Sequence, residues 1–224
     1  MSIHDGHRAR LKERFLKEGL DSFSEIQVLE LALYYCIPRK DTNPIAHALL
    51  DHFGGLSQVL EAPVEELKQI PGMGEASASY LHMITELGRY YMVHRSTQAT
   101  ILPTLEQCAE YMVPFFFGRR VEMVFLLCLD AKCKVLCCKE VGEGSVNSAG
   151  ISVRKIVETA LGANATSVVL AHNHPSGVAL PSPDDYVATD RAKSALQSIG
   201  VQLADHIIVA DNDFVSMADS GYLL

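Results

Sequence analysis

The sequence contains no apolar stretch that approaches the roughly 20 residues needed to cross a membrane as a helix. Its beginning, Met1 to His7, lacks the apolar core of a secretory signal peptide. A positive net charge is also missing, because the 224 residues carry a formal charge of −8 at pH 7. We therefore expect a cytoplasmic protein that does not enter membranes. The acidic balance argues against broad electrostatic capture of nucleic acid or membrane surfaces.

The cysteines lack the spacing of a disulfide-stabilised secreted protein. There are six of them, namely Cys36, Cys108, Cys128, Cys133, Cys137 and Cys138. The close spacing within Cys133 to Cys138 could suggest a metal site. However, the alternation and apolar neighbours of that segment are those of an ordinary strand, and no second pair of cysteines or histidines completes a site. Reduced thiols are the simplest interpretation.

The first part of the chain has the apolar spacing of helices. Of all residues, 48% are hydrophobic, which is enough for one or two buried cores. Helices are predicted for residues 7–17, 24–36, 44–52, 63–69 and 75–91. A polar, irregular segment at 94–103 follows and is interpreted as a linker. We therefore predict a helical domain over residues 1–100 and a second domain over residues 101–224.

Strands and helices are mixed in the second part of the chain. Helices are predicted for residues 105–117, 153–161 and a segment that begins at 182. Strands are predicted for residues 121–129, 135–141, 166–171, 201–209 and 214–217, and residues 145–148 are expected to extend the sheet. This mixture predicts an α/β domain in which helices pack on the faces of a sheet.

The stretch from His172 to Gly177 follows the predicted strand at 166–171 and is the most informative in the sequence. Side chains alternate along a strand, so His172 and His174 are expected to point to the same side. Ser182 has the character of a helix N-cap, with Pro183 at the first helical position. Asp185 is then placed in the first turn of that helix, close to the end of the strand that carries the histidines.

Two imidazoles and one carboxylate are the ligands of an open zinc site, with a fourth position left for water. The alternative interpretation needs no metal. A histidine at a strand end is often a structural residue whose hydrogen bonds are satisfied by its neighbours, and Ser182 with Asp185 fits a helix capping box. The joint spacing of His172, His174 and Asp185 favours one zinc ion per chain. His206, which begins a later apolar strand, is interpreted as structural, with a supporting contact to the site as the alternative.

The pattern His172-x-His174-Pro175, followed by Ser182-x-x-Asp185, resembles the JAMM motif of JAB/MPN-type zinc metalloproteases. The form His-Asn-His-Pro-Ser-Gly is similar to that of the bacterial RadC-like (UPF0758) branch. The resemblance covers most of the chain. It implies a mixed sheet with flanking helices of the JAB/MPN, cytidine deaminase-like type, preceded by a small all-α domain with a helix-hairpin-helix. It also implies hydrolysis of peptide or isopeptide bonds by zinc-activated water.

The resemblance assigns two further residues. The family's general base is a glutamate on an early strand of the domain, and Glu122 stands at the matching position, with Glu140 and Glu143 as weaker candidates. The alternative for Glu122 is a solvent-facing strand end. Ser182 matches the residue that donates a hydrogen bond to the tetrahedral oxyanion. Asp184 is left without a chemical role.

A second function class rests on Gly72-Met73-Gly74, which resembles the turn of a helix-hairpin-helix. Glycines there let the backbone approach a DNA phosphate. However, Glu75 follows directly, and residues 1–95 hold 10 basic and 13 acidic residues, a net charge of −3. A hairpin used for packing is therefore favoured. The rival function is a DNA-associated binding module whose metal site is structural or vestigial.

Overall fold

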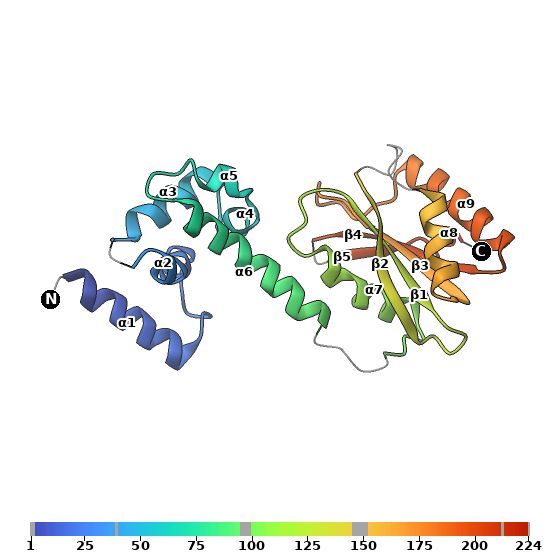
Figure 1. Ribbon diagram of the computed structural model, residues 1–224, viewed down its shortest axis with the longest axis horizontal. Helices are drawn as coiled ribbons and strands as arrows, with labels where there is room; N and C mark the ends of the chain where they lie inside the picture. Colours follow the sequence, from blue (N-terminus) through green and yellow to red (C-terminus); the bar gives the residue numbers. More distant parts are fainter. Residues whose placement is uncertain (1–2, 39, 95–99, 145–151, 212, 224) are drawn as a thin grey trace. The chain divides into compact units, whose positions relative to one another are not determined.

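The computed structural model describes residues 3–38, 40–94, 100–144, 152–211 and 213–223, with side chains from residue 6 onward. The chain divides into two units, Met1–Gly88 and Arg89–Leu224, and each is described by itself (Figure 1). Residues 95–99, half of the predicted linker, lie outside the described residues.

The first unit is entirely helical in its described part. Its helices are α1 (Ile3–Glu18), α2 (Glu25–Cys36), α3 (Asn43–Phe53), α4 (Leu56–Glu61), α5 (Val64–Leu67) and the start of α6 (Glu75–His94). All five predicted helices are present. The sequence did not predict α4, because six residues with Val59 as the one buried side chain are too short to establish a helical period.

The predicted hairpin connects α5 to α6. Gly72 has a φ of +94°, and a Cβ there would lie 2.8 Å from Cδ1 of Ile45, so the turn packs tightly on α3. The N–H of Gly74 donates to Oγ of Ser77 (2.8 Å). Nζ of Lys68 lies 2.6 Å from a carboxylate oxygen of Glu75 in α6 and 3.0 Å from one of Glu65 in α5. The Gly74 N–H and the Lys68 ammonium group are therefore paired with side chains of the same unit.

The second unit is the predicted α/β domain. Its helical segments are α7 (Leu105–Met112), a 3₁₀ turn (Val113–Phe116), α8 (Val153–Gly162) and α9 (Pro183–Ser198). Its strands are β1 (Met123–Leu129), β2 (Val135–Glu143), β3 (Ser167–Asn173), β4 (Gln202–Ala210) and β5 (Asp213–Ser216). The predicted helix at 105–117 changes to a 3₁₀ turn after Met112, because Pro114 cannot donate a helical hydrogen bond. The predicted extension at 145–148 lies outside the described residues.

The sheet is mixed, in the order β2-β1-β3-β4-β5. Strands β3 and β4 are parallel, and the other neighbours are antiparallel. One face packs on α7 through a cluster that includes Phe125 and Ile207. The opposite face packs on α8 and α9 through Val124, Leu170 and Leu196 (Figure 1). Every residue of β1 is buried, so the sheet forms the middle of a three-layer domain.

All six cysteines are free. Cys128 of β1 faces Cys137 of β2, and burial raises the pKa of the Cys128 thiol to about 12. This thiol is therefore protonated at neutral pH and serves as a small apolar side chain. No helix within the described residues is both long and apolar enough to cross a membrane.

Candidate metal centre

Strand β3 brings the two predicted histidine ligands together. It lies in the middle of the sheet, and the residues from Val168 to Asn173 are buried. His172 and His174 point to the same face, as the alternation predicts, and their Nε2 atoms lie 2.9 Å apart. The N–H of His174 still donates to the Val209 carbonyl (2.8 Å), and Pro175 then stops the ladder because it has no N–H. The pair therefore sits at the carboxyl end of β3.

Asp185 reaches the same point from the first turn of α9. The hydroxyl oxygen of Ser182 accepts from the Asp185 N–H (3.3 Å), while Oδ2 of Asp185 accepts from the Ser182 N–H (2.6 Å). This is the predicted capping box. The Ser182 hydroxyl also donates to Oδ2 (2.7 Å), whereas Oδ1 lies 3.1 Å from Nε2 of His172. A capping box and a metal ligand are thus compatible, because each uses a different oxygen of one carboxylate.

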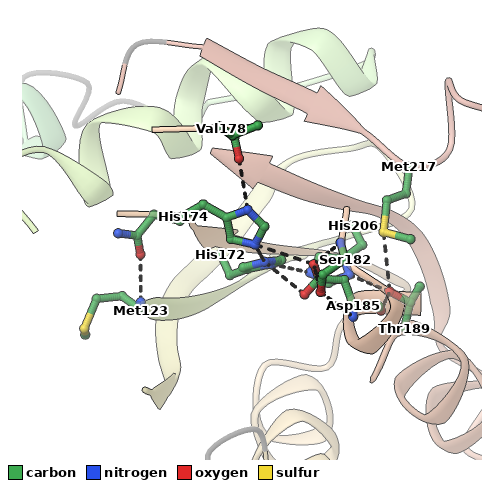
Figure 2. A network of polar contacts seen from close by, with 10 residues as sticks. Met123, His172, His174, Val178, Ser182, Asp185, Thr189, His206 and Met217 are labelled. Atoms are coloured by element: carbon green, nitrogen blue, oxygen red, sulfur yellow. Dashed lines mark hydrogen bonds and ion pairs between the residues drawn. The ribbon is translucent and has the colours of Figure 1, made fainter. Parts of the chain in front are cut away.

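Three possible ligand atoms converge at this point (Figure 2). They come from His172, His174 and Asp185 and lie within 4.8 Å of one another. The side chains of His172 and Asp185 are fully buried, whereas that of His174 is 15% exposed. The position is therefore accessible from the His174 side.

The electrostatics of Asp185 suit a cation. Burial would raise the pKa of this carboxyl, but contacts with His172 and Ser182 hold it well below its usual range, so the group is ionised at neutral pH. Its Oδ1 atom is buried and accepts no hydrogen bond from any described residue. A buried anionic oxygen without a donor is costly unless a cation compensates it.

The backbone fixes the tautomer of His174. Its Nδ1 atom lies 3.0 Å from the carbonyl oxygen of Val178. A carbonyl can only accept, so Nδ1 carries the hydrogen and Nε2 presents a lone pair to the site. Metal-binding histidines usually have such a partner on the second ring nitrogen. These observations show that the group can hold a metal ion.

His206 lies directly behind His172 (Figure 2). Its Nε2 atom is 2.8 Å from Nδ1 of His172, and its Nδ1 atom is 2.6 Å from Oγ1 of Thr189. Complete burial lowers the pKa of His206 well below its ordinary value, so this ring is neutral. His206 is therefore in contact with the site, the alternative that the sequence left open.

Glu122 stands immediately before β1. Val124 pairs with His172 across β1 and β3, and paired residues point to the same face of a sheet. Alternation gives Glu122, one residue before the strand, the same face as Val124. Its Oε2 atom is buried and has no hydrogen-bond partner among the described residues. The role of Glu122 as a base remains a prediction.

The two weaker glutamate candidates lie elsewhere. Glu140 pairs with Phe125 and Glu143 pairs with Met123 across β1 and β2. Phe125 and Met123 belong to the cluster on the α7 face of the sheet, whereas His172 is on the opposite face. Both glutamates are exposed on the edge strand β2. This geometry favours Glu122 over either of them.

Asn173 connects the two histidines to Glu122. Its Oδ1 atom accepts from the N–H of Met123 (2.7 Å), and its Nδ2 atom donates to the carbonyl of Val121 (3.1 Å). These two backbone groups flank Glu122 on either side. One buried amide therefore ties the segment that carries Glu122 to the strand that carries the histidines.

Comparison with known proteins shows the family of the chain. A family model described as RadC-like JAB domain matches residues 102–222, and one described as UPF0758 N-terminal matches residues 6–79. The chain is 34% identical over 217 residues to a UPF0758 protein of Ruegeria pomeroyi, with 97% of each chain covered. It belongs to the RadC-like UPF0758 family. Two further UPF0758 relatives are 32% identical (Fusobacterium nucleatum, 98% of each chain covered) and 33% identical (Saccharophagus degradans, 96% of each).

Sequence reasoning missed two polar residues of this UPF0758 chain, Asn173 and Thr189. Thr189 follows Asp185 by four residues on α9, and that spacing places both on one helix face, so the signal was present. The contacts of Asn173 depend on the pairing of β1 with β3 and have no local signal. Asp184 lies in the first turn of α9, as expected.

Proposed function

We propose that this chain is a zinc-dependent hydrolase of the JAMM type that cleaves peptide or isopeptide bonds. The observation that carries the proposal is the convergence of His172, His174 and Asp185, whose Oδ1 accepts no hydrogen bond from the described residues, at a buried point that is accessible from one side. Two ring nitrogens and one carboxylate oxygen suit zinc and leave a coordination position for water.

Zinc held by His172, His174 and Asp185 would supply an activated water with a pKa of about 7 and would polarise a substrate carbonyl. Glu122 is proposed to accept the proton of that water. Its Oε2 atom is buried without a donor, so this oxygen is available for the proton. Asn173 holds the backbone on both sides of Glu122 and thereby limits its movement relative to the histidines.

Ser182 is proposed to stabilise the oxyanion that forms from the substrate carbonyl. Its hydroxyl hydrogen points to Oδ2 of Asp185, so it has to rotate toward the substrate. Oδ2 keeps the Ser182 N–H as a donor during this rotation. The carboxylate therefore remains hydrogen-bonded while the hydroxyl serves the reaction.

The surroundings of the site favour a peptide over a nucleic acid. The segment from His174 to Val187 contains no lysine or arginine and two aspartates. Three apolar side chains of this segment are exposed, namely Val178, Leu180 and Val187. Without a lysine or arginine, this segment offers phosphates no ion pair, whereas apolar peptide side chains can be buried against these three residues.

A substrate screen tests the proposal. Zinc-loaded protein is incubated with diverse peptide and isopeptide libraries, and cleavage is followed by mass spectrometry. A matched sample is stripped with a chelator and then reloaded with zinc. We expect cleavage that disappears on stripping and returns on reloading. Cleavage that survives complete removal of metal would exclude the proposed chemistry.

A further inference from the structure

A chain of short hydrogen bonds runs behind the site and connects one ligand to another (Figure 2). The carbonyl oxygen of Asp185 lies 2.5 Å from Oγ1 of Thr189, which lies 2.6 Å from Nδ1 of His206. Nε2 of His206 lies 2.8 Å from Nδ1 of His172. Because Nε2 of His172 faces Oδ1 of Asp185 at 3.1 Å, the contacts close a ring. Thr189, His206 and Asp185 are fully buried.

The direction of these hydrogen bonds follows from the carbonyl of Asp185, at which the chain of hydrogen bonds ends. The Asp185 carbonyl can only accept, so the Thr189 hydroxyl donates to it. The sulfur of Met217, 3.5 Å from the same hydroxyl, is a much weaker acceptor. Thr189 has one hydroxyl hydrogen, and it must therefore accept from Nδ1–H of His206. The two ring nitrogens of the fully buried His206 face the Thr189 hydroxyl and Nδ1 of His172 and no carboxylate, so the ring carries one hydrogen, on Nδ1, and its bare Nε2 accepts from Nδ1–H of His172.

We propose that Thr189 and His206 are positioning residues that hold the Nδ1 hydrogen of His172 away from the site, so that its Nε2 lone pair is available to the metal. The inference rests on the proposed zinc site. It adds that α9 contributes to the site twice, through the Asp185 ligand and through Thr189 one turn later. Partners of this kind on metal-binding histidines are typically worth about 10–100-fold in metal affinity.

A role in packing alone makes a different prediction. If these buried groups served packing alone, they would be satisfied whichever way the hydrogen bonds ran. If Thr189 donated to His206 instead, His206 would carry its hydrogen on Nε2 and donate to His172. The hydrogen of neutral His172 would then lie on Nε2, where it blocks the metal. The tautomer of His206 therefore distinguishes the two roles.

The first measurement is the tautomer of His206 in the full-length protein. Long-range ¹H–¹⁵N correlation spectra report which ring nitrogen carries the hydrogen, in metal-free and in zinc-loaded samples. We expect the Nδ1–H form of His206 in both. The Nε2–H form in the wild-type protein would overturn the proposal, whether or not the protein binds zinc.

The second measurement is zinc affinity in Thr189→Val, determined by competition with a chromophoric chelator at fixed pH. This change keeps the side-chain shape but removes the hydroxyl. We expect affinity to fall by about 10–100-fold. Thr189→Ser keeps the hydroxyl and should restore affinity to within about threefold of wild type.

Thr85→Val is the matched control. Thr85 is a buried threonine of α6 whose hydroxyl donates to the Leu60 carbonyl (2.9 Å) within the first unit. It should leave zinc affinity unchanged. Wild-type affinity in folded Thr189→Val would refute the positioning role while the zinc site stands. Failure of wild-type protein to bind zinc would instead refute the proposed function, and the His206 tautomer would still decide the direction of the hydrogen bonds.

Discussion

At the scale of residues, the site divides its tasks between atoms of the same side chain. Asp185 uses Oδ2 to close the helix cap and leaves Oδ1 for a metal. His174 uses Nδ1 for the Val178 carbonyl and leaves Nε2 for the metal. Glu122 differs from both, because it does not belong to the group of possible ligand atoms found within the described residues. This difference underlies the proposal that Glu122 is a base and not a ligand.

Glu122→Gln tests that separation. Glutamine is nearly isosteric and cannot accept the proton at neutral pH. We expect wild-type zinc content and a turnover lowered by about 100-fold or more, the usual contribution of a positioned base. Zinc by elemental analysis and rate on a substrate from the screen are the measurements. A variant as fast as wild type would remove Glu122 from the mechanism, and one that loses zinc would make it a ligand.

At the scale of elements, the site forms where the end of β3 meets the start of α9. The strand supplies two possible ligands because its side chains alternate, and the helix supplies the third from its capping box. Strand β4 is parallel to β3 and places His206 in contact with His172. The segment from Ser182 to Asp185 therefore contains the start of α9, one possible metal ligand and the proposed oxyanion donor.

Ser182→Ala should separate capping from catalysis. The variant loses the cap of α9, and we expect a loss of about 1 kcal/mol in the free energy of unfolding. Zinc content should be retained while turnover falls. Ser152→Ala is the matched control, because Ser152 caps α8 by accepting from the Lys155 N–H (3.3 Å) and lies outside the group of ligands. It should lose similar stability at unchanged turnover, and equal turnover in both variants would count against Ser182.

How much of this could be predicted depends on the range of the interactions. The convergence of His172, His174 and Asp185 and the cap of α9 were predictable because alternation in a strand and the Ser-x-x-Asp spacing are local patterns. The contact of His206 with His172 and the bridge from Asn173 to the Glu122 segment were not. They depend on how β3 pairs with β4 and β1, and no short stretch of sequence encodes that register.

At the scale of the whole molecule, the chain combines an α/β unit with a helical unit whose hairpin already pairs the Gly74 N–H and Lys68 within the unit. A hairpin that binds DNA offers free N–H groups and positive charge to a phosphate. Here the Gly74 N–H donates to Ser77, and Lys68 is paired with two glutamates. These contacts support the interpretation of the hairpin as a packing element.

The full-length protein is therefore expected to bind duplex DNA no more tightly than about 10⁻⁴ M at physiological salt, the weak end of non-specific binding. Fluorescence anisotropy at several salt concentrations measures this. Gly74→Asp is the matched variant, because a Cβ at this position meets no other atom within 4 Å and the change should not disturb folding. Tight, salt-sensitive binding that is lost in Gly74→Asp would show that the hairpin is a DNA-binding element.

The central claim is that His172, His174 and Asp185 hold one zinc ion per chain. Elemental analysis of purified protein, after zinc supplementation and removal of unbound metal, tests it most directly. The account predicts one zinc per chain in wild-type protein, a strong loss in His174→Ala, and full zinc content in His82→Ala, which removes an exposed histidine of α6. Folded wild-type protein that retains no transition metal under these conditions would contradict it.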